Sequence, residues 1–93
     1  MSERTTRQPA KQKKRRGSYV PAAMHAMSAT FGANVERLRL AAGLSRRALA
    51  HAAGMTDPSL LTIERGQTHP RLYYALRLAG ALGVSLLELI EDH

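Results

Sequence analysis

The stretch RRALAHAAGMTDPSLLTIER, residues Arg46–Arg65, determines the architecture expected for this chain. Its apolar residues fall on one side of each of two short helices, with Leu49 facing inward from the first and Ile63 from the second. Gly54 lies between them, where a tight turn requires a positive φ that glycine adopts at little cost. Thr56 is suited to cap the second helix, because its hydroxyl can accept a hydrogen bond from a first-turn amide. The stretch therefore predicts two helices joined by a very short turn.

Two helices joined by a turn of about three or four residues that contains glycine form a helix-turn-helix, whose second helix enters the major groove of DNA. Ala50 is small at the position where the two helices would cross, so their backbones can approach closely. Pro58 lies in the first turn of the second helix, where a missing N–H costs nothing. The local pattern thus indicates binding to double-stranded DNA.

Composition restricts the other functions open to the chain. A domain of 93 residues has little room for an enzyme pocket, and the absence of cysteine excludes disulfides and thiolate sites. No segment approaches the ~18 consecutive apolar residues of a membrane span, and no apolar run near the amino terminus ends in a cleavage signal. We therefore expect a cytoplasmic protein that is not an enzyme, needs no cofactor and does not contact a membrane.

The net charge of +7 is unevenly distributed. Residues 1–18 contain seven of the fourteen Lys and Arg residues but one of the seven acidic ones. We interpret residues 1–29 as a basic, largely disordered arm and residues 30–93 as the folded domain. Two roles for the arm stay open: a tail that only aids solubility, or an arm that follows phosphates or enters the minor groove. The basic side chains expected to make such contacts are Lys11, Lys13, Lys14, Arg15 and Arg16.

Apolar spacing and capping residues predict an all-α, compact bundle. Its five helices are expected at about residues 30–42, 46–53, 57–65, 72–82 and 86–91. Ser28 or Thr30 is the expected N-cap of the first helix, and a short extra helix from about Ala22 is a further possibility. The fourth helix is expected to bury Leu72, Leu76, Ala79 and Leu82.

The last predicted helix, SLLELIED, bears on the oligomeric state. Leu86, Leu89 and Ile90 are expected to close the core of the domain, while Leu87 falls on another face. An exposed apolar patch here would form the contact of a homodimer.

Several pieces of the chain occur in the order and spacing of one known family: LRLAAGLS (38–45), the Leu49-Ala50 pair with Gly54, IERG (63–66), Pro70, and LAGALGVSLLELI (78–90). Together they resemble the phage repressor and Cro family of helix-turn-helix DNA-binding domains, often called XRE-type. The resemblance covers Phe31 to about Ile90. It implies a sequence-specific transcriptional regulator, in our interpretation a repressor, that binds a palindromic operator as a homodimer.

The resemblance also implies roles for individual residues. Arg39 and Glu64 match a pair that ties the first helix to the end of the recognition helix in the family. Arg46 occupies the position of a residue that grips phosphate, and His69 belongs to a loop that follows the DNA backbone. The implied DNA-binding set is Arg46, Arg47, Thr56, Asp57, Pro58, Ser59, Leu61, Thr62, Arg65, Gln67 and Thr68.

The recognition helix departs from the family pattern, because its exposed front lacks the Arg, Lys, Asn and Gln side chains that read base edges best. Specificity is therefore expected to depend on DNA shape. Two alternatives follow from the same sequence. The domain could be an antitoxin-like or bridging module with Leu61 as an anchor for another protein, such as a toxin or the transcription machinery. It could also bind nucleic acid without specificity through residues 1–18.

Other chemistry-bearing residues do not form a recognisable site. The four histidines, at positions 25, 51, 69 and 93, show no helical i, i+4 pair, so we expect no zinc site. Glu88, Glu91 and Asp92 are expected on a solvated helix end, and Tyr73 and Tyr74 as half-buried residues of the fourth helix.

Overall fold

The computed structural model describes residues 21–92, and within this range the chain is helical with no strand. Its helices in chain order are α2 (Pro21–Ala41), α3 (Arg46–Ala53), α4 (Asp57–Glu64), α5 (Leu72–Leu82) and α6 (Leu86–Ile90). The predicted all-α bundle of five helices is confirmed. The phosphate contacts predicted for Lys11–Arg16 lie outside the described residues.

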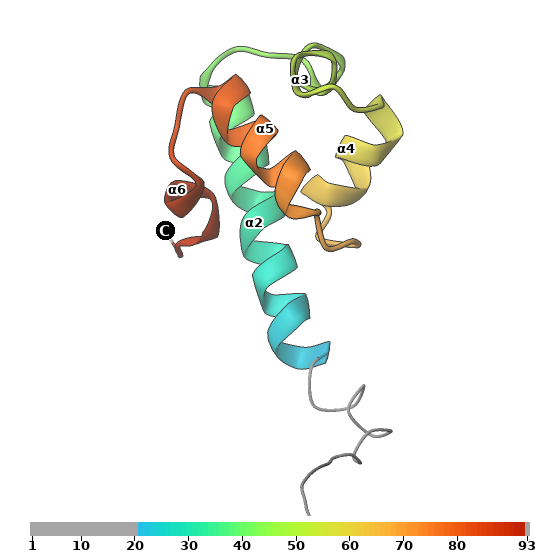
Figure 1. Ribbon diagram of the computed structural model, residues 1–93, viewed down its shortest axis with the longest axis vertical. Helices are drawn as coiled ribbons and strands as arrows, with labels where there is room; N and C mark the ends of the chain where they lie inside the picture. Colours follow the sequence, from blue (N-terminus) through green and yellow to red (C-terminus); the bar gives the residue numbers. More distant parts are fainter. Residues whose placement is uncertain (1–20, 93) are drawn as a thin grey trace, which may run out of the picture.

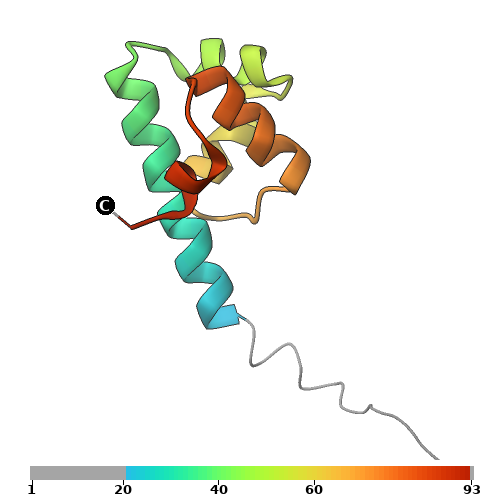
Figure 2. The ribbon, with the colours of Figure 1, turned by 60° about the vertical axis from the view of Figure 1, so that its left-hand side comes forward.

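Helix α2 is the long rod around which the other helices are arranged (Figure 1). Helices α4 and α6 pack directly against it, while α5 contacts α3, α6 and α2. The first turns of α2 project beyond the rest of the bundle, as Figure 2 shows from a second direction. The core therefore lies beside the carboxyl-terminal half of α2.

The expectation that the first helix begins near Thr30 is wrong, because α2 begins at Pro21. The boundary drawn between residues 29 and 30 thus falls inside a continuous helix. Proline is tolerated in the first turn of a helix, and the alanines and methionines that follow are good helix formers. Ser28 consequently lies mid-helix and cannot act as an N-cap; its side chain is buried and bonds to His69.

The capping and turn residues of the other helices lie where their chemistry predicts. The hydroxyls of Ser45, Thr56 and Ser85 each accept a hydrogen bond from the amide three residues on. Gly54 adopts φ 73° and ends α3 in the left-handed region. Local signals therefore fixed the ends of α3, α4 and α6 correctly to within one residue.

A close helix crossing joins α2 to α4 at Gly32. A Cβ atom built on this glycine would lie 2.2 Å from the carbonyl oxygen of Ile63 and 2.8 Å from that of Glu64. Such separations are far inside van der Waals contact, so only glycine permits this approach. Phe31 and Val35 flank the crossing and are buried in the core.

The buried face of α5 agrees with the prediction only in part: Ala79 is buried and Leu82 partly buried, but the other two predicted residues are not. Leu72 and Leu76 are 66% and 52% exposed, whereas Ala75, Leu78 and Ala79 are buried. Leucines occupy two faces of this helix, and both faces satisfy helical spacing. The structure buries the face that carries alanines, because small side chains let α5 approach α3 closely. On its outer side Tyr73 is exposed, not half-buried as predicted.

Helix α6 closes the core through two of the three apolar residues expected to do so. Leu89 is fully buried and Leu86 partly buried, but Ile90 is exposed, contrary to expectation. Asn34 of α2 holds the end of this helix, since its Nδ2 donates to the carbonyls of Leu89 at 3.0 Å and Glu91 at 2.7 Å. The five-residue α6 is thus anchored by a buried amide that no sequence pattern had indicated.

We predict that Gly32→Ala destabilises the domain, because the added methyl group forces α2 and α4 apart. Overpacking of this kind costs about 1–3 kcal/mol. Gly80→Ala is the matched control, since its Cβ would meet nothing within 4 Å and alanine favours a helix interior by about 0.5–1 kcal/mol. Urea unfolding followed by circular dichroism measures both free energies. Equal stability of the two variants would contradict the close crossing.

Candidate nucleic-acid interface

Helices α3 and α4 form a helix-turn-helix around a three-residue turn at 54–56. The N–H of Met55 donates to the carbonyl of Ala50 at 2.9 Å, which closes the carboxyl end of α3. Thr56 then caps α4 through the amide of Ser59 at 3.2 Å. Ala50 is buried between the helices, as its small size predicted. The turn therefore fixes the direction in which α4 leaves α3.

Arg77 of α5 contacts this turn and stabilises it. Its Nε donates to the carbonyl of Ala53 at 2.6 Å, and its guanidinium lies 5.5 Å from the ring centre of Tyr73. A side chain at position 54 would come within 3.0 Å of the same guanidinium. Gly54 is thus favoured by its positive φ, and any larger residue here would also have to displace the guanidinium of Arg77 slightly.

One side of α4 is held in the core and the other faces solvent. Leu60 and Ile63 are buried, whereas Pro58 and Ser59 are exposed and Thr62 is half-buried. Helix α4 lies at the edge of the bundle, and no other described segment covers its outer side in Figure 1. A helix presented in this way is sterically free to enter a groove.

Several arginines flank α3 and α4 in the sequence, and their side chains are accessible to solvent. Arg47 at the start of α3, Arg65 after α4 and Arg71 before α5 are exposed, and Arg46 is half-buried. Gln67 and Thr68, in the loop after α4, are also exposed. These groups can donate hydrogen bonds to an anionic backbone.

The pair formed by Arg39 and Glu64 lies in the interior between α2 and α4. Arg39 donates from Nε to Oε2 of Glu64 at 2.7 Å and from Nη2 to Oε1 at 3.2 Å, a two-pronged arrangement. The side chains are 7% and 2% exposed. Arg39 also donates to the carbonyl of Leu44 at 2.9 Å, which fixes the segment between α2 and α3. The two side chains are thus in direct contact between α2 and α4, the arrangement that the resemblance implied for this pair.

Residues 35–89 match the model of a helix-turn-helix family, HTH_3, which is more than half of the chain. The matched range includes the turn, the exposed helix and the arginine–glutamate pair. The chain belongs to the XRE-type helix-turn-helix family. It is accordingly a DNA-binding transcriptional regulator, a class of protein distinct from enzymes.

Individual relatives agree with this assignment. The chain is 36% identical over 64 residues to the HTH-type transcriptional regulator y4dJ of Sinorhizobium fredii, a match covering 69% of this chain and 83% of the relative. The restriction-modification controller protein C.AhdI from Aeromonas hydrophila is similar in structure, with a TM-score of 0.66 and 38% identity over 69% of this chain and 97% of that one. A hypothetical transcription factor from Neisseria, NHTF, gives a TM-score of 0.70 at 25% identity, covering 74% and 78%.

The hydroxyl groups of Thr56, Ser59 and Thr62 are partly engaged in hydrogen bonds within the first turns of α4. Thr62 donates its hydroxyl to the carbonyl of Ser59 at 2.8 Å, and Thr56 donates to the hydroxyl of Ser59 at 2.8 Å. The oxygen of Thr62 can still accept a hydrogen bond from a base amino group. Leu61 is half-buried and Pro58 exposed, so both can make apolar contact with a thymine methyl group.

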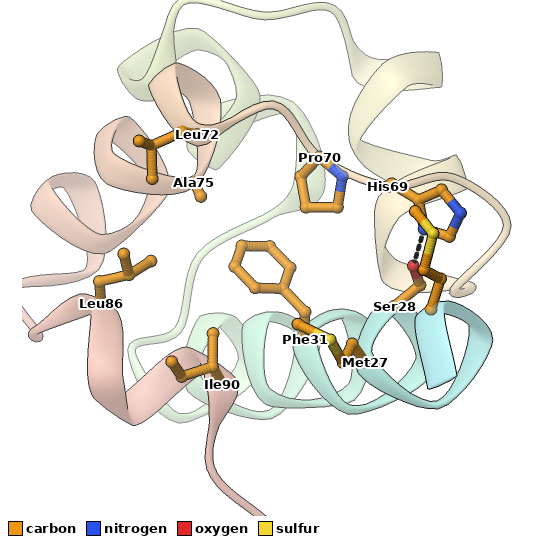
Figure 3. A pocket seen from close by; sticks show the side chains of 10 residues that line it. Met27, Ser28, Phe31, His69, Pro70, Leu72, Ala75, Leu86 and Ile90 are labelled. Carbon is orange, nitrogen blue, oxygen red and sulfur yellow. Dashed lines mark hydrogen bonds between the residues drawn. The ribbon is translucent and has the colours of Figure 1, made fainter. Parts of the chain in front are cut away.

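The loop after α4 is held against the amino-terminal half of α2. Ser28 and His69 are hydrogen-bonded through Oγ and Nδ1 (Figure 3), and the His25 ring stacks on His69 with centroids 6.3 Å apart. Sequence analysis missed this anchor, because Ser28 looks like a helix cap until the helix is known to begin earlier. The anchor holds Gln67 and Thr68 beside the end of α4.

Within residues 21–92, no three His, Cys, Asp or Glu side chains come together in a group that could hold a metal ion. No helix in the same range has the length and apolar character needed to cross a membrane.

We predict that Glu64→Ala costs about 3–5 kcal/mol of folding free energy, because it leaves the buried guanidinium of Arg39 unpaired. The double variant Arg39→Met/Glu64→Leu should recover much of this loss by replacing the pair with apolar packing. Glu36→Ala, at an exposed glutamate of α2, is the control and should change stability by less than about 0.5 kcal/mol. Urea denaturation compares them. A loss at Glu64 no larger than at Glu36 would show that the pair is not structural.

Proposed function

We propose that this protein is a repressor that occupies a palindromic operator as a homodimer, with α4 of each copy in the major groove. The observation that carries the proposal is the uncovered outer side of α4, held outward by Leu60 and Ile63 and bordered by accessible arginines. An operator bound in this way is blocked to other proteins by occupancy alone, without a catalytic step.

Phosphate contacts are proposed to supply most of the affinity. Arg46, Arg47, Arg65 and Arg71 carry positive charge around the helix-turn-helix, and Gln67 and Thr68 add neutral donors. The basic residues of the arm, Lys11, Lys13, Lys14, Arg15 and Arg16, are proposed to extend these contacts along the backbone. Affinity should therefore fall steeply with salt concentration.

Base recognition is proposed to be sparse and supported by DNA shape. The direct contacts available from α4 are a hydroxyl acceptor on Thr62 and apolar contacts from Pro58 and Leu61. Asp57 can accept from a cytosine amino group, and its carboxylate also favours the amino end of α4. Much of the discrimination then comes from how readily the operator adopts the required groove width.

An apolar face formed by α2, α5 and α6 supports the proposed dimer. It surrounds a hollow of about 280 Å³ that lies between Met27, Phe31, Leu72, Leu86 and Ile90 (Figure 3). Met27, Leu72 and Ile90 are exposed, as is Leu76 one turn further along α5. Exposed apolar surface of this kind marks interaction sites. We propose that a second copy is seated here; dimers of helix-turn-helix proteins bind half-sites about 34 Å apart.

Selection of bound duplexes from a random DNA pool tests the proposal as a whole. A palindromic consensus with half-sites one helical turn apart is the expected result. A single unsymmetrical site would overturn the dimer. Binding without any preferred sequence, lost when residues 1–18 are deleted, would overturn sequence-specific regulation. Stoichiometric capture of a toxin by the intact protein, with no operator selected, would favour the antitoxin-like alternative.

We predict that Thr62→Ala changes the preference among operator variants more than overall affinity. The relative affinities should shift by about fivefold, since one neutral hydrogen bond contributes about 1 kcal/mol. Thr68→Ala, in the loop, is the contrasting variant and should weaken all duplexes equally, as loss of a backbone contact does. Competition binding against a panel of single-base operator variants distinguishes the two patterns. If Thr62→Ala and Thr68→Ala change the affinities for the operator variants in the same way, Thr62 does not contact the bases.

We predict that Leu72→Lys raises the dimer dissociation constant at least about tenfold, because it places a charge in an apolar contact. Leu40→Lys is the control: Leu40 is similarly exposed on α2 but does not line the hollow. Sedimentation equilibrium of both variants and the wild type, alone and with operator duplex, measures the effect. Equal association of the two lysine variants would place the dimer contact elsewhere.

A further inference from the structure

The buried carboxylate of Glu64 has a second arginine partner besides Arg39. Arg46, the first residue of α3, donates from Nε to Oε1 of Glu64 at 3.1 Å. The same Oε1 accepts Nη2 of Arg39 at 3.2 Å, so the two guanidinium groups share one oxygen. The family resemblance implied a phosphate contact for Arg46 and a pairing of Glu64 with Arg39, but no bond between Arg46 and Glu64.

The two arginines differ in how far the protein encloses them. The side chain of Arg39 is 7% exposed, whereas that of Arg46 is 33% exposed. Among the described residues, no hydrogen bond engages the two Nη atoms of Arg46. Arg46 therefore has one edge of its guanidinium fixed on an interior carboxylate and retains donors for a second acceptor.

The charges of this cluster indicate what the second acceptor is. One carboxylate faces two guanidinium groups, which leaves a net positive charge at the partly exposed Arg46. The first turn of α3 contains no acidic residue, and the amino end of a helix adds partial positive charge. An anion beside Arg46 would balance the cluster, and a guanidinium can bind a carboxylate and a phosphate at the same time because its donors lie on different edges.

We propose that Glu64 is a positioning residue for DNA binding: by holding Nε of Arg46, it orients the remaining donors of that guanidinium toward a backbone phosphate. This inference rests on the proposed function, in which Arg46 contacts the operator backbone. It means that the same carboxylate that joins α2 to α4 also sets the direction of a DNA contact from α3. Arginine is required at position 46 for its forked shape, and positive charge alone is insufficient.

Lysine at position 46 keeps the positive charge of Arg46 but removes the forked shape of its guanidinium, so this variant separates the two effects. Arg46→Ala should weaken binding to every duplex by about tenfold and lower the salt dependence by about one unit, as loss of a charge-assisted phosphate contact does. Arg46→Lys should lose nearly as much, because an ammonium is a compact group that Glu64 holds away from the phosphate. Arg47 provides the matched pair on the same helix turn. Lysine at 47 should recover most of the binding that Arg47→Ala loses, because no carboxylate of the described residues pairs with this arginine.

A double-variant cycle tests the role of Glu64 itself. Glu64→Gln is introduced into the wild type and into the Arg46→Ala variant. The affinity of each protein for duplex DNA is then measured by titration, at a temperature well below its melting temperature, and is corrected for the fraction of protein that is folded and able to bind. Glu64→Gln should weaken binding in the wild type and add nothing in the Arg46→Ala background. A purely structural glutamate would lower the melting temperature in both backgrounds without any affinity change that depends on Arg46. Where Glu64→Gln does not fold, the lysine series decides alone.

The outcomes separate this inference from the proposed function. Full binding by Arg46→Lys would overturn positioning by Glu64 and leave Arg46 as an ordinary phosphate ligand. Wild-type binding by Arg46→Ala would overturn both the contact and its positioning, while the operator selection and the Thr62→Ala panel still judge whether α4 reads DNA. Equal loss in Arg46→Lys and Arg46→Ala, with rescue by lysine at 47, would support the inference.

Discussion

The carboxylate of Glu64 is the interaction on which the rest of the structure depends. It lies at the end of α4 and binds Arg39 of α2 and Arg46 of α3, so one buried anion joins three helices. Arg39 continues the connection to the carbonyl of Leu44. A buried ion pair adds little net stability compared with apolar packing, but it tolerates few arrangements. Its effect here is to fix how the two helices of the helix-turn-helix meet the long helix behind them.

Packing around α2 reinforces the same geometry without charge. Gly32 allows the backbone of α4 to approach, and Asn34, two residues further along α2, secures α6. Arg77 holds the turn between α3 and α4 from the side of α5. Each contact joins residues distant in sequence, and each leaves the outer side of α4 open. The interior therefore positions the outer side of α4, where we propose that DNA is contacted, without taking part in it.

The sequence predicted most of the local structure, because caps and turns depend on neighbouring residues. Ser45, Gly54 and Thr56 specify the helix-turn-helix through their own backbone and side-chain chemistry. The buried face of α5 was predicted correctly at Ala79 and wrongly at Leu72 and Leu76, since both leucine-bearing faces fit helical spacing and the decision lies with the partner helix. The short helix that stayed a possibility from about Ala22 is the beginning of α2 itself, which continues without a break into the helix expected from Thr30.

Some contacts of the site residues could be inferred from the sequence, and others appear only in the folded structure. The family resemblance paired Arg39 with Glu64, and the structure places them in contact. It did not reveal the tie between Glu64 and Arg46, or the anchor between Ser28 and His69, because neither bond leaves a mark in residue spacing. Such contacts depend on where two separate segments come to lie, which only the folded arrangement determines.

The dependence of α6 on Asn34 has a consequence for how the domain opens. A helix of five residues forms too few internal hydrogen bonds to persist alone. Its free energy of local unfolding is consequently set by a side chain of α2 and by the burial of Leu89, so the carboxyl-terminal segment should detach as a unit before the bundle melts. In that state the hollow beside Phe31 loses the wall that Leu86 and Ile90 provide.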